Sequence, residues 1–114
     1  MNPVLIETIR KAVEARRPIS FEYEKEGKVC GERIGNPHVV FAGKTRDGIP
    51  RVWIHVVQTG GVSDTLDDFP EWRMFIGEFI RNVVVLEDER QFEVFDGYNP
   101  DSHIYTGTEI LAKI

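Results

Sequence analysis

The hydrophobic positions near the start of the chain recur with a helical period. Apolar side chains are spaced three and four residues apart at Val4, Leu5, Ile6, Ile9, Ala12 and Val13. Asn2 and Pro3 are typical of a helix start, because Asn accepts bonds from the first free N–H groups and Pro has the helical φ. Pro18 ends the pattern, since proline disfavours helical backbone at the residue before it. We therefore predict an amphipathic helix over residues 3–17.

From Ile19 the hydrophobic period changes to two, which is the period of a β-strand. Ile19, Phe21 and Tyr23 alternate with polar residues and so share one face of a predicted strand. Residues 26–27 form a glycine-containing turn, and residues 28–34 are expected to return as a second strand.

Glycine and proline divide the following chain into short segments. Residues 35–37 predict a break before an apolar run. Residues 51–58 are strong β formers that end at two glycines, so we expect a central strand there. Extended structure resumes at residues 72–76, a short helical turn is expected at 77–80, and residues 83–86 predict a short buried strand.

These elements predict an α+β fold that is mainly β. One helix and five or six short strands, without the long connections of βαβ units, favour an antiparallel sheet that curls into a small barrel. We expect a single domain over residues 1–114, with the barrel at about 18–95 and an irregular C-terminal tail at 96–114. Residues 108–113 of this tail are predicted to form either a short helix or a docking strand.

Charge is distributed unevenly along the chain. Residues 1–57 carry ten basic and seven acidic residues, whereas residues 58–114 carry four and twelve, so a +3 half and a −8 half give the net charge of −5. A uniformly basic surface is excluded, and with it the nonspecific nucleic-acid binding that neutralises many phosphates. Two alternatives stay open, a local cationic pocket or a basic helix that packs near the acidic tail.

Hydropathy and cysteine content bear on the location of the protein. No segment approaches the ~20 apolar residues of a membrane span. Glu7 lies where a signal peptide would have its apolar region. Cys30 is the single cysteine, so no intramolecular disulfide can form. We expect a cytoplasmic protein with no membrane partner.

Five segments occur in an order that resembles one known family. They are residues 5–13, 18–23, 33–40, 53–55 and 73–80. They resemble, in turn, the opening helix, the first strand, the segment with an Arg before a Pro and an apolar pair, the Trp-Tyr-Leu motif and the Arg-x-Phe strand of the WYL domain family. The resemblance implies an Sm/SH3-like barrel of the kind attached to DNA-binding modules in bacterial regulators and defence proteins. Because no helix-turn-helix pattern accompanies it, we expect a free-standing member whose protein partner carries the DNA-binding module.

Arg73 is the first candidate for a ligand-binding residue. It lies in an apolar run and must reach water or an anion, because burying an unpaired guanidinium is costly. Its planar fork can hold a phosphate or carboxylate through two bonds. The alternative is an ion pair that closes the neighbouring loop, with Asp67, Asp68 or Glu71 as its partner.

Six further residues complete the candidate site, each with a structural role as the alternative. Trp53 offers a face on which a base can stack. Arg33 and Arg51 extend a cationic rim, and Tyr23 stacks or donates its hydroxyl. Two histidines, His38 and His55, are expected to bond a ligand or to titrate near neutral pH. Two separated histidines do not make a metal motif, so we expect no metal and no cofactor.

The sequence favours binding over catalysis. It contains no motif for a nucleophile with its base, no phosphate-binding glycine loop and no paired carboxylates, so we expect no enzyme. The leading hypothesis is a regulatory domain in transcription or defence that senses a negatively charged nucleotide-like ligand or single-stranded nucleic acid. The second is a protein-interaction module that forms a homodimer through an open barrel edge or through tail aromatics, namely Phe92, Phe95, Tyr98 and Tyr105. The third is a small hydrolase that uses His38 or His103.

Overall fold

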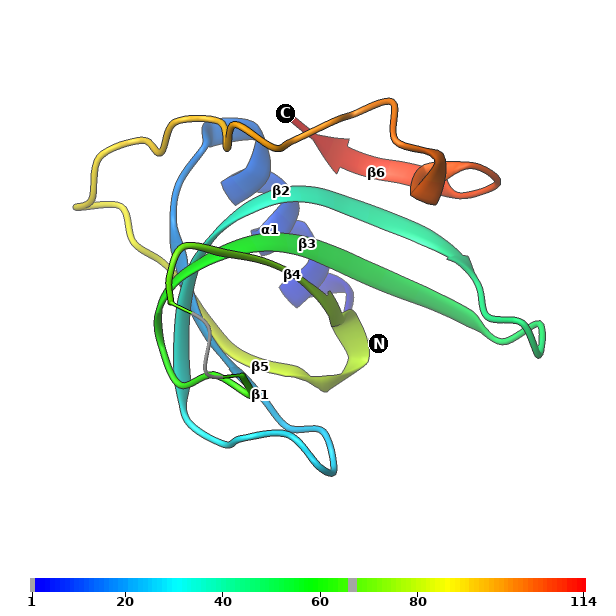
Figure 1. Ribbon diagram of the computed structural model, residues 1–114, viewed down its shortest axis with the longest axis horizontal. Helices are drawn as coiled ribbons and strands as arrows, with labels where there is room; N and C mark the ends of the chain where they lie inside the picture. The colour runs from blue at the N-terminus through cyan, green and yellow to red at the C-terminus, as the bar shows by residue number, and fades with distance from the viewer. Residues whose placement is uncertain (1, 66–67) are drawn as a thin grey trace.

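The computed structural model describes residues 2–65 and 68–114. These residues form one α-helix, six strands and two 3-10 turns (Figure 1). In chain order the elements are α1 (Pro3–Ala15), β1 (Ile19–Tyr23), β2 (Glu32–Lys44), β3 (Pro50–Gly61), β4 (Glu71–Ile76), η1 (Gly77–Phe79), β5 (Ile80–Val85), η2 (His103–Tyr105) and β6 (Glu109–Lys113). The fold is therefore α+β and mainly β, as predicted.

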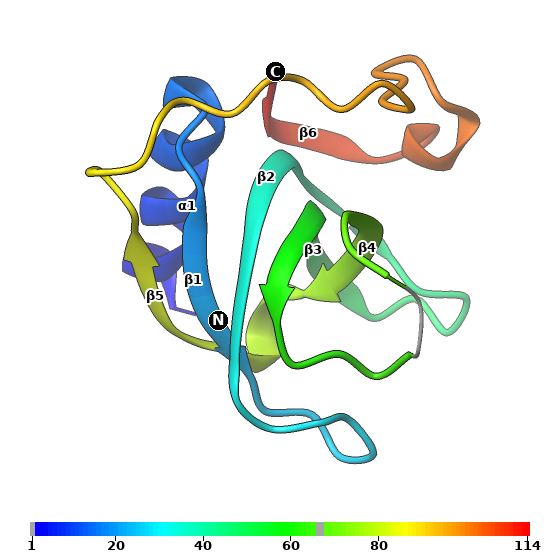
Figure 2. The ribbon, with the colours of Figure 1, turned by 60° about the vertical axis from the view of Figure 1, so that its left-hand side comes forward.

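The six strands form one antiparallel sheet that curls without closing. The strand order is β4-β3-β2-β1-β5, and β6 joins the sheet by pairing with β2. Along one edge β2 pairs with β3, while its other edge pairs first with β1 and then with β6 (Figure 2). The end strands β4 and β5 are joined by η1, the helical turn that the sequence predicts there.

Helix α1 is shorter than the predicted span of residues 3–17. It begins as expected, because Asn2 Oδ1 accepts the N–H of Val4 at 2.9 Å. It ends at Ala15, since Arg16 has the left-handed φ of 52° and turns the chain. The N–H of Arg17 closes this end by donating to the carbonyl of Ala12 at 2.9 Å.

The predicted break at residues 35–37 is wrong. Strand β2 runs through it without interruption, with register shifts between Ile34 and Gly35 and between Pro37 and Val39. Proline is tolerated at such an irregularity because its missing N–H removes no regular ladder bond. Position 35 requires glycine, since a Cβ at this residue would lie 2.4 Å from Val56 Cγ1 on the neighbouring strand β3.

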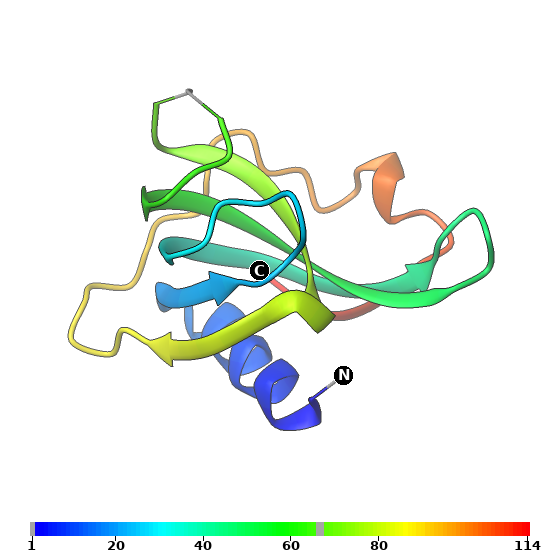
Figure 3. The same cartoon turned by 90° about the horizontal axis from the view of Figure 1, so that it is seen from below.

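The main hydrophobic core fills the space between α1 and the inner face of the curled sheet (Figure 3). Ile9 and Val13 of the helix are fully buried in it. At its centre the ring of Phe75 makes edge-to-face contacts with Phe21 and Tyr23, with centroid distances of 5.0 and 4.9 Å. These geometries are favourable for aromatic pairs and stabilise the curl.

The strand predicted over residues 83–86 exists but is not buried. It is the second half of β5, which pairs with β1 at the end of the sheet order. The side chain of Val84 is 55% exposed as a result. A run of valines is thus compatible with an edge strand as well as with a core strand.

The C-terminal residues cover the other face of the sheet. Residues 86–108 cross it with little regular structure, and β6 then adds a strand rather than a helix (Figure 1). Beneath them a second apolar cluster forms from Val39, Phe41 and Tyr105. Among the described residues, no helix is both long and apolar enough to span a membrane.

Candidate functional site: a pocket beside strand β4

Three predicted site residues, Tyr23, Trp53 and Arg73, line one pocket of about 300 Å³. Because β4 lies at the end of the sheet order, residues from both of its faces reach this pocket. The remaining lining residues are Lys25, Lys28, Asp64, Met74, Phe75 and Ile76. A larger hollow of about 500 Å³ lies between α1 and the end of β5, and none of the predicted residues lines it.

Arg73 is tied to acidic residues at the edge of the pocket. Its Nη1 donates to Glu71 Oε2 at 3.0 Å and to Ser63 Oγ at 3.1 Å. Its Nη2 lies 3.5 Å from Asp64 Oδ2. The predicted alternative of a loop-closing ion pair is therefore present for Glu71, while Asp67, another predicted partner, lies outside the described residues.

Arg33 does not lie on a rim but inside the curled sheet, where its side chain is 0% exposed. Its Nη2 donates to the carbonyl of Val29 at 3.0 Å and to Asp64 Oδ2 at 3.1 Å. The guanidinium carbon lies 5.4 Å from the ring centroid of Phe75 and 5.8 Å from that of Tyr23. Its Nε and Nη1 have no hydrogen-bond partner among the described residues.

Asp64 joins the two arginines and was not predicted as their partner. Besides the arginines it bonds to backbone, since its Oδ1 accepts the N–H of Val29 at 2.7 Å. Burial alone would raise the pKa of this carboxyl group, but the N–H of Val29 and the charge of Arg33 outweigh it and lower the pKa. The carboxylate is thus held in its charged form. No local sequence pattern marks Asp64 as this partner, because it lies 31 residues after Arg33 and meets it only through the fold.

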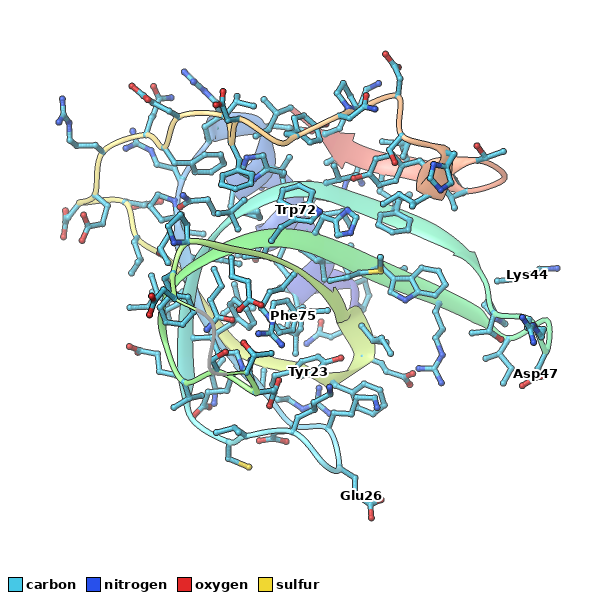
Figure 4. All side chains as sticks on the ribbon, in the orientation of Figure 1. Tyr23, Glu26, Lys44, Asp47, Trp72 and Phe75 are labelled. Atoms are coloured by element: carbon cyan, nitrogen blue, oxygen red, sulfur yellow. The ribbon has the colours of Figure 1, made fainter. Side chains whose placement is uncertain are left out.

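Two of the aromatic residues that line the pocket, Tyr23 and Trp53, differ in how deeply they are buried. Tyr23 is buried, and its hydroxyl accepts the N–H of Ile76 at 3.0 Å, which fixes β1 to β4. Figure 4 shows Tyr23 and Phe75 together inside the curl. Trp53 is half-buried and stacks on Phe41 with a centroid distance of 5.6 Å. Tyr23 therefore positions β4, and Trp53 is the more accessible ring.

Arg51 lies apart from the pocket beside β4. It forms an ion pair with Glu78, and its guanidinium carbon lies 5.9 Å from the ring centroid of Phe79. It lines a smaller hollow of about 200 Å³ together with Ile49 and Pro50. The structure does not bring Arg51 together with Arg33 and Arg73.

His38 and His55 contact the C-terminal segment instead of the pocket. His38 Nδ1 lies 2.8 Å from the carbonyl of Asn36, and its Nε2 accepts the N–H of Phe95 at 3.0 Å. His55 Nδ1 lies 2.7 Å from the hydroxyl oxygen of Tyr105. Burial lowers the pKa of both histidines, and with the added effect of His38 the pKa of His55 falls to about 4. His55 therefore does not titrate near neutral pH.

Sequence reasoning missed two further cations at the pocket. Lys25 and Lys28 lie in the turn between β1 and β2, and both line the pocket. Lys25 Nζ lies 5.8 Å from the ring centroid of Phe79. The sequence predicts a strand from residue 28, whereas β2 begins only at Glu32, so the longer turn that carries both lysines to the pocket was not predicted.

The described residues contain no group of three or more His, Cys, Asp or Glu side chains that could hold a metal ion. No protein-family model, curated protein or solved structure matches the chain. The resemblance to the WYL domain family therefore stays a prediction from the sequence.

Proposed function

We propose that this protein is a noncatalytic domain that binds a negatively charged, nucleotide-like ligand in the pocket beside β4. One observation carries the proposal: Trp53 and three cationic side chains, from two strands and a turn, line the same pocket. The cations are Lys25, Lys28 and Arg73. In the proposed setting, ligand binding serves a regulatory role in transcription or defence.

The chemistry of the lining supports an anion with an aromatic part. Among the described lining residues, the three cations are opposed by one carboxylate, that of Asp64. Stacking of a base on an aromatic side chain contributes about 1–3 kcal/mol per base in single-strand binders. The pocket volume of about 300 Å³ lies at the small end of ligand sites, which favours a single nucleotide unit over a long nucleic-acid track.

The scaffold is proposed to be an Sm/SH3-like barrel of the WYL type. Support comes from the strand order, in which β5 returns to pair with β1, and from the 3-10 turn η1 between β4 and β5. The sequence segments that resemble the family include Trp53 and Arg73, both of which line the pocket. A bacterial protein partner with a DNA-binding module belongs to the same proposal.

Binding of a fluorescently labelled nucleotide, followed by anisotropy at low and near-physiological salt, tests this function. We expect Lys28→Ala and Trp53→Ala to weaken binding roughly tenfold each, because each removes one contact worth about 1.4 kcal/mol. Lys44→Ala is the matched control, since Lys44 is an exposed lysine that does not line the pocket. Unchanged binding in both pocket variants, with folded protein, would sink the proposal.

A second candidate function is protein interaction through the edge of β4. Met74 on this end strand is 46% exposed. The tail aromatics, by contrast, pack on the protein's own sheet, where Phe95 stacks on Trp72 with a centroid distance of 6.0 Å. A homodimer in sedimentation that Met74→Lys converts to monomer would favour this function. A monomer at high concentration that also captures no partner in a pull-down would count against it.

A further inference from the structure

We propose that Arg33 is the buried anchor of a phosphate-type oxyanion subsite, and that Asp64 is an internal anion which the ligand's phosphate replaces. This inference rests on the proposed function and deepens it. It moves the main anion contact from Arg73 at the pocket edge to Arg33 behind the pocket wall. It also gives Asp64 a role as a built-in competitor.

Asp64 is held in the manner of a bound anion. Its Oδ2 accepts a hydrogen bond from Arg33 Nη2 at 3.1 Å and lies 3.5 Å from Arg73 Nη2. Its Oδ1 accepts the backbone N–H of Val29 at 2.7 Å. Two guanidinium groups and a backbone N–H are the donors that proteins use to bind phosphate. The surroundings of this carboxylate therefore suit an oxyanion of another molecule.

Arg33 offers more donors than Asp64 uses. A guanidinium has five N–H donors. The hydrogen bonds that Arg33 makes to Val29 and Asp64 both leave from Nη2, and its buried Nε and Nη1 have no partner among the described residues. A buried donor without an acceptor destabilises a protein, so such donors are normally paired. One carboxylate oxygen of Asp64 is bonded to a backbone N–H, so only the other oxygen is available to Arg33. A tetrahedral phosphate can offer several oxygens to the same guanidinium.

The position of Asp64 gives the ligand a route to Arg33. Asp64 lines the pocket and its side chain is 13% exposed, while Arg33 is fully buried and contacts Asp64. A phosphate that entered the pocket would meet Asp64 first and reach Arg33 by taking its place. Lys28 lines the same pocket and supplies further positive charge for a dianion.

Asp64→Asn removes the competing charge, and inorganic phosphate is the probe. We expect phosphate to bind Asp64→Asn roughly tenfold more tightly than wild type in calorimetry, because a hydrogen bond to a charged group has about this worth. Phosphate should also raise the Tm of Asp64→Asn more than that of wild type at equal ionic strength. Glu71→Gln, the matched control, removes a carboxylate that forms an ion pair with Arg73 and a hydrogen bond with Thr65 but does not contact the Arg33 guanidinium, so it should change phosphate affinity far less.

Adding Arg33→Met to Asp64→Asn should abolish the gain, since the buried anchor is then gone. The inference is overturned if phosphate binds wild type and Asp64→Asn equally, or if Arg33→Met leaves the gain intact. Where Asp64→Asn does not fold in chloride, refolding it in phosphate at the same ionic strength replaces calorimetry. Recovery in phosphate alone supports the subsite, and equal recovery in both salts or in neither overturns it.

The two proposals fail in different ways. If wild type binds nucleotides through Lys28 and Trp53 but Asp64→Asn gains no phosphate affinity, the pocket function holds and the Arg33 subsite is wrong. If Asp64→Asn gains phosphate affinity through Arg33 while nucleotides bind no better than phosphate, the subsite holds and the nucleotide preference is wrong.

Discussion

The Nε2 atom of His38 accepts the backbone N–H of Phe95 at 3.0 Å, and this bond fastens the C-terminal segment to β2. An accepting Nε2 carries no proton, so the proton of the neutral ring lies on Nδ1, which faces the carbonyl of Asn36. A second bond joins His55 to the hydroxyl of Tyr105. Two buried neutral histidines therefore hold this segment on the sheet.

Stability should decrease as pH falls through the range in which these histidines gain protons. The pKa of His55 is lowered from its ordinary value of 6.5 to about 4 in the fold, so the unfolded chain binds more protons between these values. The stabilising contribution of neutral His55 is therefore fully present above pH 6.5. It is lost progressively as the pH falls toward 4, and the free energy of unfolding decreases by roughly 3 kcal/mol from His55 alone. Urea unfolding at a series of pH values measures this loss.

His103 is the control for this prediction, because it is exposed. His103→Gln should still lose stability between pH 6.5 and 4, because His55 is retained. The low pKa of Asp64 acts in a separate range, since its contribution is lost only as pH falls below the usual value of 3.8. A stability that stays flat from pH 6.5 to 4 would contradict the assignment of neutral, buried histidines.

Tyr105→Phe should destabilise the fold by about 1–2 kcal/mol, because it leaves the buried His55 Nδ1 without its hydroxyl partner. The ring itself, which packs on Phe41, is retained. Tyr98→Phe removes a hydroxyl that donates to the carbonyl of Ile114 at 3.2 Å and is only half-buried, so its effect should be smaller. Chemical denaturation of both variants measures which of them loses more stability.

Gly35→Ala should destabilise the protein by roughly 3 kcal/mol or prevent folding, because overpacking in a core is costly. The added Cβ would lie 2.4 Å from Val56 Cγ1 and 2.8 Å from the carbonyl oxygen of Val57. Gly60→Ala is the control on the neighbouring strand, where the nearest atoms lie 3.9 Å away. Thermal unfolding that shows equal Tm values for the two variants would refute the close approach of β2 and β3.

Phe75→Ala should cost about 3–5 kcal/mol, as is usual for the loss of a buried aromatic ring. Phe75 is 2% exposed and contacts Phe21, Tyr23 and the guanidinium of Arg33. Met74→Ala at the adjacent position removes a side chain that is 46% exposed and should change stability by less than about 0.5 kcal/mol. Similar losses in urea unfolding would show that the inner face of β4 is assigned wrongly.

The elements that depend on nearby residues could be predicted from the sequence. The helix start at Asn2, the alternation from Ile19 and the turn at Gly77 each depend on side chains within a few positions. The continuity of β2 could not, because Gly35 is determined by Val56 on another strand. The exposure of Val84 depends on the place of β5 in the sheet order, which no local pattern contains.

The candidate site, too, could be predicted only in part from the sequence. Residue types and strand positions were enough to select Tyr23, Trp53 and Arg73, which meet at one pocket. The burial of Arg33 and its bond to Asp64 depend on a loop that returns to β2 from 31 residues away. The histidines were recognised as polar strand residues, but their partners lie in the C-terminal segment, whose path the sequence left undefined.

The pairing of β2 with β6 has a consequence during biosynthesis. Val39 pairs with Lys113, so half of one β2 edge pairs with β6, which is synthesised after the other strands of the sheet. Until then the backbone groups of residues 39–42 on this edge lack their final partner, and such edges are sites at which growing chains associate. Rapid overproduction should therefore favour aggregation of nascent chains, and slower synthesis at low temperature should increase the yield of folded protein.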